Sequence, residues 1–246
     1  MLRLLCITAH PDDEAGGFGG TLLHYASRGV ETHVICLTPG QAGSHRGPAQ
    51  SSAELAALRR EEFAASCKIL KVSQGEVLGY EDAALYRADF FAVVGDLAQR
   101  VRKIRPHVMI TLGTEGAVTA HPDHSMAALF ATMAFHWAGR KSLFPEQLAN
   151  GLEAHRTQKL YYGTAEFTIK EREPVSLAPI TVTLDISPYL ASKLAAFRAH
   201  TTQAPLFPIF ERNVMRLGGK ERFHLAAAVT PRLAQPEADL FEGVTE

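Results

Sequence analysis

Two short polar segments in this chain of 246 residues combine the side chains that metal-dependent hydrolysis uses. Residues 10–14 have the sequence HPDDE, and residues 121–124 have the sequence HPDH. Together they can supply two imidazoles and one carboxylate, which suit a catalytic zinc ion with three protein ligands and one position for water. A metal in such a site lowers the pKa of that water toward ~7 and polarises a carbonyl group. The predicted chemistry is therefore hydrolysis.

Further imidazole and carboxylate groups remain beside any three ligands, and hydrolysis needs such groups for proton transfer. Asp12 and His121 are the candidates for taking a proton from water and for assisting the oxyanion or the leaving group. A phosphate-binding loop is disfavoured at residues 10–14, because three carboxylates would repel a phosphate. The glycines that follow, at positions 16, 17, 19 and 20, also lack the spacing of a dinucleotide-binding loop.

Both polar segments are predicted to follow strands of one sheet. Residues 2–8 form an apolar run that predicts a buried strand before HPDDE, and residues 107–112 predict another before HPDH. A helix over 17–28 and a strand over 30–37 complete a βαβ pattern, which favours a parallel sheet. Because ligands bind beyond the carboxyl ends of strands in open α/β sheets, the two segments can converge on one site.

The rest of the chain continues this alternation and then becomes less regular. A loop is predicted over 39–52, and helices and strands are predicted over 53–70, 76–79, 88–104, 123–138, 158–164, 179–186 and 188–200. We therefore expect one α/β domain over 1–246, with a Rossmann-like, mostly parallel sheet flanked by helices. A less regular C-terminal α+β part is expected to pack on it. The prolines and acids of residues 231–246 predict a loose tail.

Composition narrows the functional classes. The formal net charge is −1, which excludes a generally basic nucleic-acid binder, and no apolar run reaches the ~18 residues of a membrane span. The three cysteines are too few for a disulfide framework and fit a reducing compartment. Because the N-terminus also lacks the pattern of a secretory signal, we expect a cytoplasmic protein with no nucleic-acid or membrane partner.

The polar segments resemble motifs of the PIG-L/LmbE superfamily of zinc-dependent N-acetylglucosaminyl deacetylases. Ala9 completes the AHPDDE motif of that family. Further resemblances follow in the family's order: LTPGQAG at 37–43, LRREE at 58–62, LGYED at 78–82 and KLAAFRAHTTQ at 193–203. One departure is Pro39, where many relatives carry a polar residue, so this loop says little about the substrate.

The resemblance implies roles for the residues that match these motifs. The zinc ligands would be His10, Asp13 and His124, and iron stays open as the working metal in the cell. Asp12 would be the general base that activates the zinc-bound water. His121, oriented by Asp123, would stabilise the tetrahedral oxyanion or protonate the amine.

Three further matches are implied to contact the substrate: Arg59, Asp82 and His200. His200 would reach the site from the C-terminal part of its own or of a neighbouring subunit, since homo-oligomers are common among relatives. Simpler interpretations stay open for each residue. Arg59 would then belong to a solvent-exposed helix face, Asp82 to a turn, and His200 to a helix C-terminus.

The implied function is removal of the acetyl group from an N-acetylglucosamine-type substrate, with zinc-bound water attacking the amide carbonyl. Deacetylation of GlcNAc–malate in bacillithiol biosynthesis is one such reaction. Alternatives within the family are deacetylation of the GlcNAc–inositol precursor of mycothiol, amidase activity on thiol S-conjugates, and deacetylation of chito-oligosaccharides. Outside the family, the two-His, one-carboxylate set would suit an Fe(II) oxygenase, and a sugar-binding module without turnover also stays open.

Overall fold

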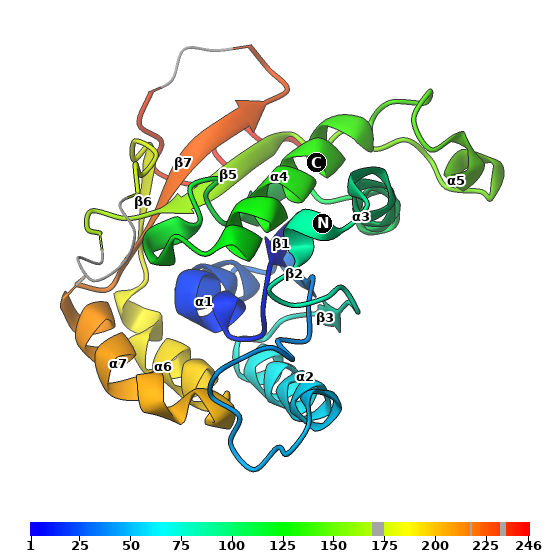
Figure 1. Cartoon of the computed structure of the whole chain (residues 1–246). Helices are drawn as coiled ribbons and strands as arrows, with labels where there is room; N and C mark the ends of the chain where they lie inside the picture. Colours follow the sequence, from blue (N-terminus) through cyan, green and yellow to red (C-terminus); the bar gives the residue numbers. More distant parts are fainter. Residues whose placement is uncertain (169–174, 217, 232–234) are drawn as a thin grey trace.

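A seven-stranded sheet with helices on both faces forms the body of the chain (Figure 1). The computed structural model describes every residue except 169–174, 217 and 232–234. The strands follow the order β3-β2-β1-β4-β5-β7-β6 across the sheet. Their bounds are β1 Arg3–Thr8, β2 Glu31–Cys36, β3 Gln74–Val77, β4 Val108–Thr111, β5 Lys159–Thr164, β6 Val182–Asp185 and β7 Lys220–Ala228.

The sheet is parallel through its first five strands. β1 pairs in parallel with β2 and β4, β2 pairs with β3, and β4 pairs with β5. β7 is antiparallel to both of its neighbours, β5 and β6. The predicted mostly parallel α/β sheet is therefore confirmed. The strand order switches between β1 and β4, and open sheets of this kind bind ligands at such a switch point.

Helices in the crossovers cover the two faces of the sheet. α1 and α2 connect strands on the β2 side of β1, whereas α3 and α4 connect strands toward β5, so right-handed crossovers place the two pairs on opposite faces. α6 packs against α1 and α2 (Figure 1). The helices are α1 Asp13–Ala26, α2 Ser52–Ile69, α3 Phe90–Ile104, α4 Pro122–Trp137, α5 Pro145–Ala149, α6 Leu190–Arg198 and α7 Phe207–Arg216. Among the described residues, none of these helices is long and apolar enough to cross a bilayer.

The centre of the sheet is apolar and enclosed. Every residue of β4 is buried, and so is every residue of β1 after Arg3. Strands buried on both faces need near-continuous apolar sequences, which is why apolar runs located these two strands. The core therefore holds the carboxyl ends of β1 and β4 rigidly beside each other.

Some elements differ from the prediction. α1 begins at Asp13, ahead of the helix start predicted at residue 17. One of the glycines near its start has a packing reason, because a Cβ on Gly20 would lie 2.5 Å from the Cβ of Ile186. The short helix α5, the helix α7 and the strand β7 had no counterpart in the prediction.

Several of the described residues 235–246, which were predicted to lie in a loose tail, contact the body of the chain. Leu240 is fully buried, and the Tyr25 hydroxyl donates to Asp239 at 2.9 Å. Glu237 forms a buried ion pair with Lys159 at 2.7 Å. Acids that composition assigned to solvent therefore serve as partners for buried donors. Of the predicted tail positions 231–234, the structure describes only residue 231.

Candidate active site

The two polar segments meet at the carboxyl ends of β1 and β4, which are neighbours in the sheet. His10 lies in the turn between β1 and α1, and His124 lies in the first turn of α4. The ring centroids of His10 and His124 are 5.2 Å apart, and that of His121 is 4.8 Å from His10. The structure thus brings together the segments that the sequence predicted to converge.

Three side chains present potential metal ligands to one another. Asp13 Oδ1 lies 3.1 Å from His124 Nε2, and Asp13 Oδ2 lies 3.6 Å from His10 Nδ1. Two ligands of a tetrahedral site with bonds of about 2.0–2.1 Å are roughly 3.3 Å apart, so the spacing between Asp13 Oδ1 and His124 Nε2 suits two ligands of one ion. The backbone N–H groups of Ala9 and His10 donate to Asp13 Oδ2, at 3.2 and 2.9 Å, and leave Oδ1 available.

The second ring nitrogen of each histidine is already engaged. His10 Nε2 lies 3.1 Å from Asp82 Oδ1 and 3.4 Å from Asp123 Oδ2. His124 Nδ1 lies 3.2 Å from Thr119 Oγ1. Histidines that bind metals use their second nitrogen in this way, which fixes the tautomer and the ring orientation. The residues present therefore fit a metal ion.

The charge state of Asp13 agrees with this fit. Burial works against an ionised Asp13, but the neighbouring His124 and His10 rings outweigh it and hold the pKa of this carboxyl well below its usual range. A carboxylate binds a metal in its deprotonated form. Asp13 is therefore in the state that a ligand requires.

The carboxylates of Asp82 and Asp123 contact His10 at Nε2, the ring nitrogen that is not the one near Asp13. With His10 they form a second group of potential metal ligands, whose atoms lie within 4.8 Å of one another. Both carboxylates, however, also accept backbone N–H groups: Asp82 from Ala42 at 2.8 Å, and Asp123 from Ala83 at 2.7 Å. We expected Asp82 to contact the substrate, whereas in the structure it is buried and directed at His10.

His121 is held differently from the expectation. The Asp123 carboxylate does not orient its ring; the backbone N–H of Asp123 donates to His121 Nδ1, at 3.1 Å. Burial, with repulsion from His10 and His124, lowers the pKa of His121. The ring is therefore neutral at neutral pH, and with Nδ1 as acceptor its proton resides on Nε2. One ring nitrogen of each of the three histidines lies within 4.8 Å of the others, so the His121 ring is close to the ligand set.

Asp12 lies beside the ligand set and retains access to solvent. Its side chain is 19% exposed, and its Oδ2 accepts from Arg59 Nη2 at 2.9 Å. Burial and the neighbouring charge of Asp13 raise the pKa of Asp12 to about 6, although Arg59 works against the rise. A carboxylate with this pKa can accept a proton at neutral pH and release it again.

Arg59 is buried in protein rather than directed to open space. Its guanidinium donates to the carbonyl oxygen of Pro11, to that of Gly40 at 3.2 Å, and to Asp12. Gly40 has φ +69°, and a Cβ there would lie 2.3 Å from Arg59 Nη1. The LTPGQAG loop therefore leaves room for Arg59, whose contact with a substrate stays a prediction.

His200 is fully buried and does not reach the surface of the site. Its Nε2 lies 2.7 Å from Glu14 Oε1 in the same chain. Its partner in the structure is Glu14, and a contact between His200 and a substrate stays a prediction. The next residues, Thr201 and Thr202, donate to Glu62 at 2.6 and 2.7 Å.

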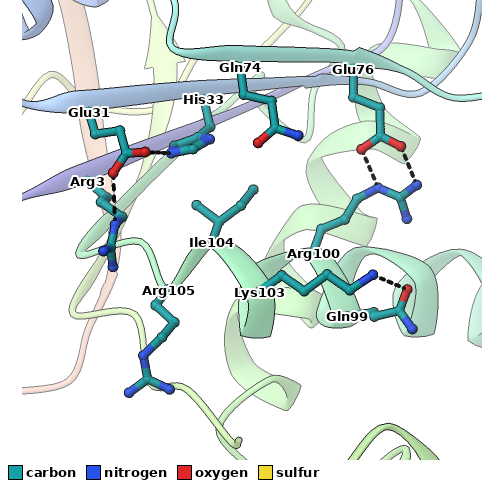
Figure 2. Close-up of a pocket in the computed structure, with 10 residues that line it drawn as sticks. All are labelled: Arg3, Glu31, His33, Gln74, Glu76, Gln99, Arg100, Lys103, Ile104 and Arg105. Atoms are coloured by element: carbon teal, nitrogen blue, oxygen red, sulfur yellow. Dashed lines mark hydrogen bonds and ion pairs between the residues drawn. The ribbon is translucent and has the colours of Figure 1, made fainter. Parts of the chain in front are cut away.

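A cavity of about 570 Å³ lies away from this site, at the amino ends of β1 to β3 beside the last turn of α3 (Figure 2). Four of the charged side chains around it form ion pairs, Arg3 with Glu31 at 3.0 Å and Arg100 with Glu76 at 2.6 Å. A ligand pocket needs polar groups that are free to converge on the ligand. The HPDDE site meets that condition better.

Comparison with known proteins identifies the family. The family model described as PIG-L, GlcNAc-PI de-N-acetylase, matches residues 5–135, which contain both polar segments. This chain belongs to the PIG-L family. It is 30% identical to a 1D-myo-inositol 2-acetamido-2-deoxy-alpha-D-glucopyranoside deacetylase of Salinispora arenicola, over 98% of this chain and 91% of the relative.

Solved structures extend the similarity of this PIG-L protein. The N,N'-diacetylchitobiose deacetylase of Pyrococcus horikoshii superimposes with a TM-score of 0.78 and 25% identity, over 93% of this chain and 86% of that one. GalB, the 4-carboxy-2-hydroxymuconate hydratase of Pseudomonas putida, gives a TM-score of 0.73 at 22% identity, over 95% and 100%. The fold is thus shared by proteins with different reactions, and the reaction must be argued from the site.

Proposed function

We propose that this protein is a zinc-dependent deacetylase that removes the acetyl group from an N-acetylglucosamine-type amino sugar. The observation that carries the proposal is the Asp12 carboxylate next to the donor set of His10, Asp13 and His124. A carboxylate beside a metal suits the activation of water as a general base. The names of the relatives, which are deacetylases of amino sugars, support the substrate class.

The residues of the site can divide the reaction between them. When bound, a zinc ion supplies polarisation of the acetamide carbonyl and a lowered pKa for water. Asp12 accepts the proton that the water loses while the water oxygen bonds to the carbonyl carbon. His121 donates its Nε2–H to the carbonyl oxygen as negative charge develops there. Asp12 then returns the proton to the amine nitrogen as the C–N bond breaks, which releases acetate and the free amine.

The substrate within this class is a further part of the proposal. The relatives named above act on an inositol conjugate of GlcNAc and on diacetylchitobiose. A panel should therefore contain free N-acetylglucosamine, GlcNAc–malate, the GlcNAc–inositol conjugate, diacetylchitobiose and a thiol S-conjugate. The ranking of kcat/KM over this panel identifies the group attached to the sugar.

Metal analysis combined with acetate release tests the proposal. We expect about one zinc per chain, as in a site with three protein ligands, and acetate release from at least one panel member. Asp12→Asn should keep the metal and lose roughly 10²- to 10⁴-fold in kcat. A metal-loaded protein that releases acetate from no panel member would overturn the proposal, and so would Asp12→Asn with wild-type kcat. Oxygen consumption would favour the Fe(II) oxygenase, and saccharide binding without turnover would favour the binding module.

A further inference from the structure

Glu14 is a fully buried carboxylate beside the ligand set, and the reaction described above does not use it. Its Oε1 accepts from Ser66 Oγ at 2.6 Å and lies 2.7 Å from His200 Nε2. Its Oε2 accepts the backbone N–H of Asp12 at 3.0 Å. Ser66 on α2 and His200 after α6 are both fully buried, so two distant parts of the chain hold this carboxylate against Asp12.

The peptide bond between Pro11 and Asp12 is held at both of its polar ends. Its N–H group donates to Glu14 Oε2, and its carbonyl oxygen, that of Pro11, accepts from Arg59. Because a peptide unit is planar, fixing both polar groups fixes the orientation of the whole unit. The proline ring further restricts the backbone on the preceding side.

The backbone of Asp12 needs such restraint. Its φ is 112°, which is in the left-handed range that residues other than glycine rarely adopt. Strained conformations of this kind persist where the surroundings impose them, and they are frequent at active sites. The direction of the Asp12 side chain follows from this backbone, which leaves the carboxylate on Arg59 and beside Asp13.

We propose that Glu14, held by Ser66 and His200, is a positioning residue that fixes the peptide bond between Pro11 and Asp12 and thereby aims the Asp12 carboxylate. The inference rests on the proposed function, because it takes Asp12 as the general base. It assigns His200 an indirect role, in which the His200 ring holds Glu14 against the backbone of Asp12.

A purely structural role is the competing explanation, and Glu221 provides the matched comparison. Glu221 is also a buried carboxylate that accepts backbone N–H groups of α1, from Gly20 at 2.9 Å and from Thr21 at 2.8 Å. It is held by Lys193 and acts on a later turn of the same helix. Loss of either carboxylate should lower stability, but only loss of the Glu14 carboxylate should change the base.

The test compares Glu14→Met, Glu14→Gln and Glu221→Gln in the zinc-loaded full chain. Met removes the acceptor, so we expect kcat to fall about 10²-fold with KM changed less than about 2-fold and with full zinc content. Gln keeps an acceptor for the Asp12 N–H and can donate its amide to the neutral His200 ring, so kcat should stay within roughly 5-fold of wild type. Glu221→Gln should lower Tm and leave kcat unchanged. If Glu14→Met fails to fold, Ser66→Ala decides, with an expected loss of at least about 3-fold in kcat.

An Asp12→Asn background separates positioning from general damage. A residue that acts through Asp12 has no further effect once Asp12 is lost, so Glu14→Met should lower the residual kcat of Asp12→Asn by less than about 2-fold. An additive loss in the double variant would overturn the inference, as would a wild-type kcat in Glu14→Met, or in Ser66→Ala where that variant decides. Loss of zinc from Glu14→Met would indicate that Glu14 positions the metal ligand Asp13 rather than Asp12, and it would also overturn the inference.

A crystal structure of Glu14→Met supplies a readout that does not depend on activity. We expect Asp12 to leave the left-handed region and its carboxylate to leave Arg59. An unchanged Asp12 with φ near its present value would overturn the inference. If the wild-type protein released acetate from no panel member, the proposed function would fail, while this structure would still decide whether Glu14 fixes Asp12.

Discussion

Replacing Asp82 by Asn tests whether Asp82 orients a metal ligand. Its Oδ1 faces His10 Nε2 at 3.1 Å, and its Oδ2 accepts from the Ala42 N–H at 2.8 Å. Both partners are donors when His10 binds a metal through Nδ1, but Asn has one acceptor oxygen, so one hydrogen bond becomes a contact between two donors. Loss of an orienting contact of this kind weakens metal binding by roughly 10- to 100-fold, or ~1.4–2.8 kcal/mol.

Competition for zinc with a chelator of known affinity measures this effect. Asp96→Asn is the matched control, because Asp96 accepts from Tyr80 at 3.0 Å and pairs with Arg100, away from the ligand set. The control should keep the wild-type Kd for zinc. An unchanged Kd in Asp82→Asn would refute the role of Asp82 in orienting His10. A raised KM with an unchanged Kd would instead support the contact of Asp82 with substrate that the family resemblance implies.

Three further changes have defined outcomes. Arg102→Met should lower the free energy of unfolding in denaturant by about 3–5 kcal/mol, because the buried guanidinium donates to four backbone carbonyls at the end of α4 and before α5. Gly40→Ala should lower kcat at constant zinc content, since its Cβ would displace Arg59, and its positive φ adds ~1 kcal/mol of destabilisation. Replacing His200 by Gln should lower Tm most between pH 4.5, the ordinary pKa of Glu14, and pH 6.5, the ordinary pKa of His200. Although burial opposes both effects, Glu14 raises the pKa of His200, and His200 lowers the pKa of Glu14. The Tm advantage of wild type is therefore lost as the pH rises through the raised pKa of His200 or falls through the lowered pKa of Glu14.

The sequence predicted the parallel sheet because burial on both faces leaves an unmistakable apolar run in β1 and β4. It predicted the meeting of HPDDE and HPDH because both segments follow such strands. It did not predict β7, whose first half carries Lys220, Glu221 and Arg222. Two of these side chains are buried through ion pairs, Glu221 with Lys193 and Arg222 with Glu166, and a hydropathy pattern contains no record of such partners.

The residue types alone also did not predict which carboxylate contacts which imidazole ring. Asp82 and Asp123 lie 41 positions apart, yet both face one nitrogen of His10. This juxtaposition depends on the path of the loop after β3 relative to α4, which no local pattern encodes. The substrate roles implied for Arg59 and His200 stay predictions, because a motif match identifies a residue near a site without saying on which side of it the residue lies.

One feature in the sequence of α2 explains why motif matches that lie far apart in the chain contribute to the same site. The buried face of α2 contains Leu55, Arg59, Glu62 and Ser66, a helical spacing that places three polar groups on the stripe expected to be apolar. Burying such groups is costly unless each has a partner, and each has one in the site's framework. Arg59 holds the Pro11 carbonyl, Ser66 holds Glu14, and Glu62 holds Thr202 next to His200. The LRREE and HTTQ segments therefore act together to fix the conformation of the HPDDE turn, and contacts from α2 connect them.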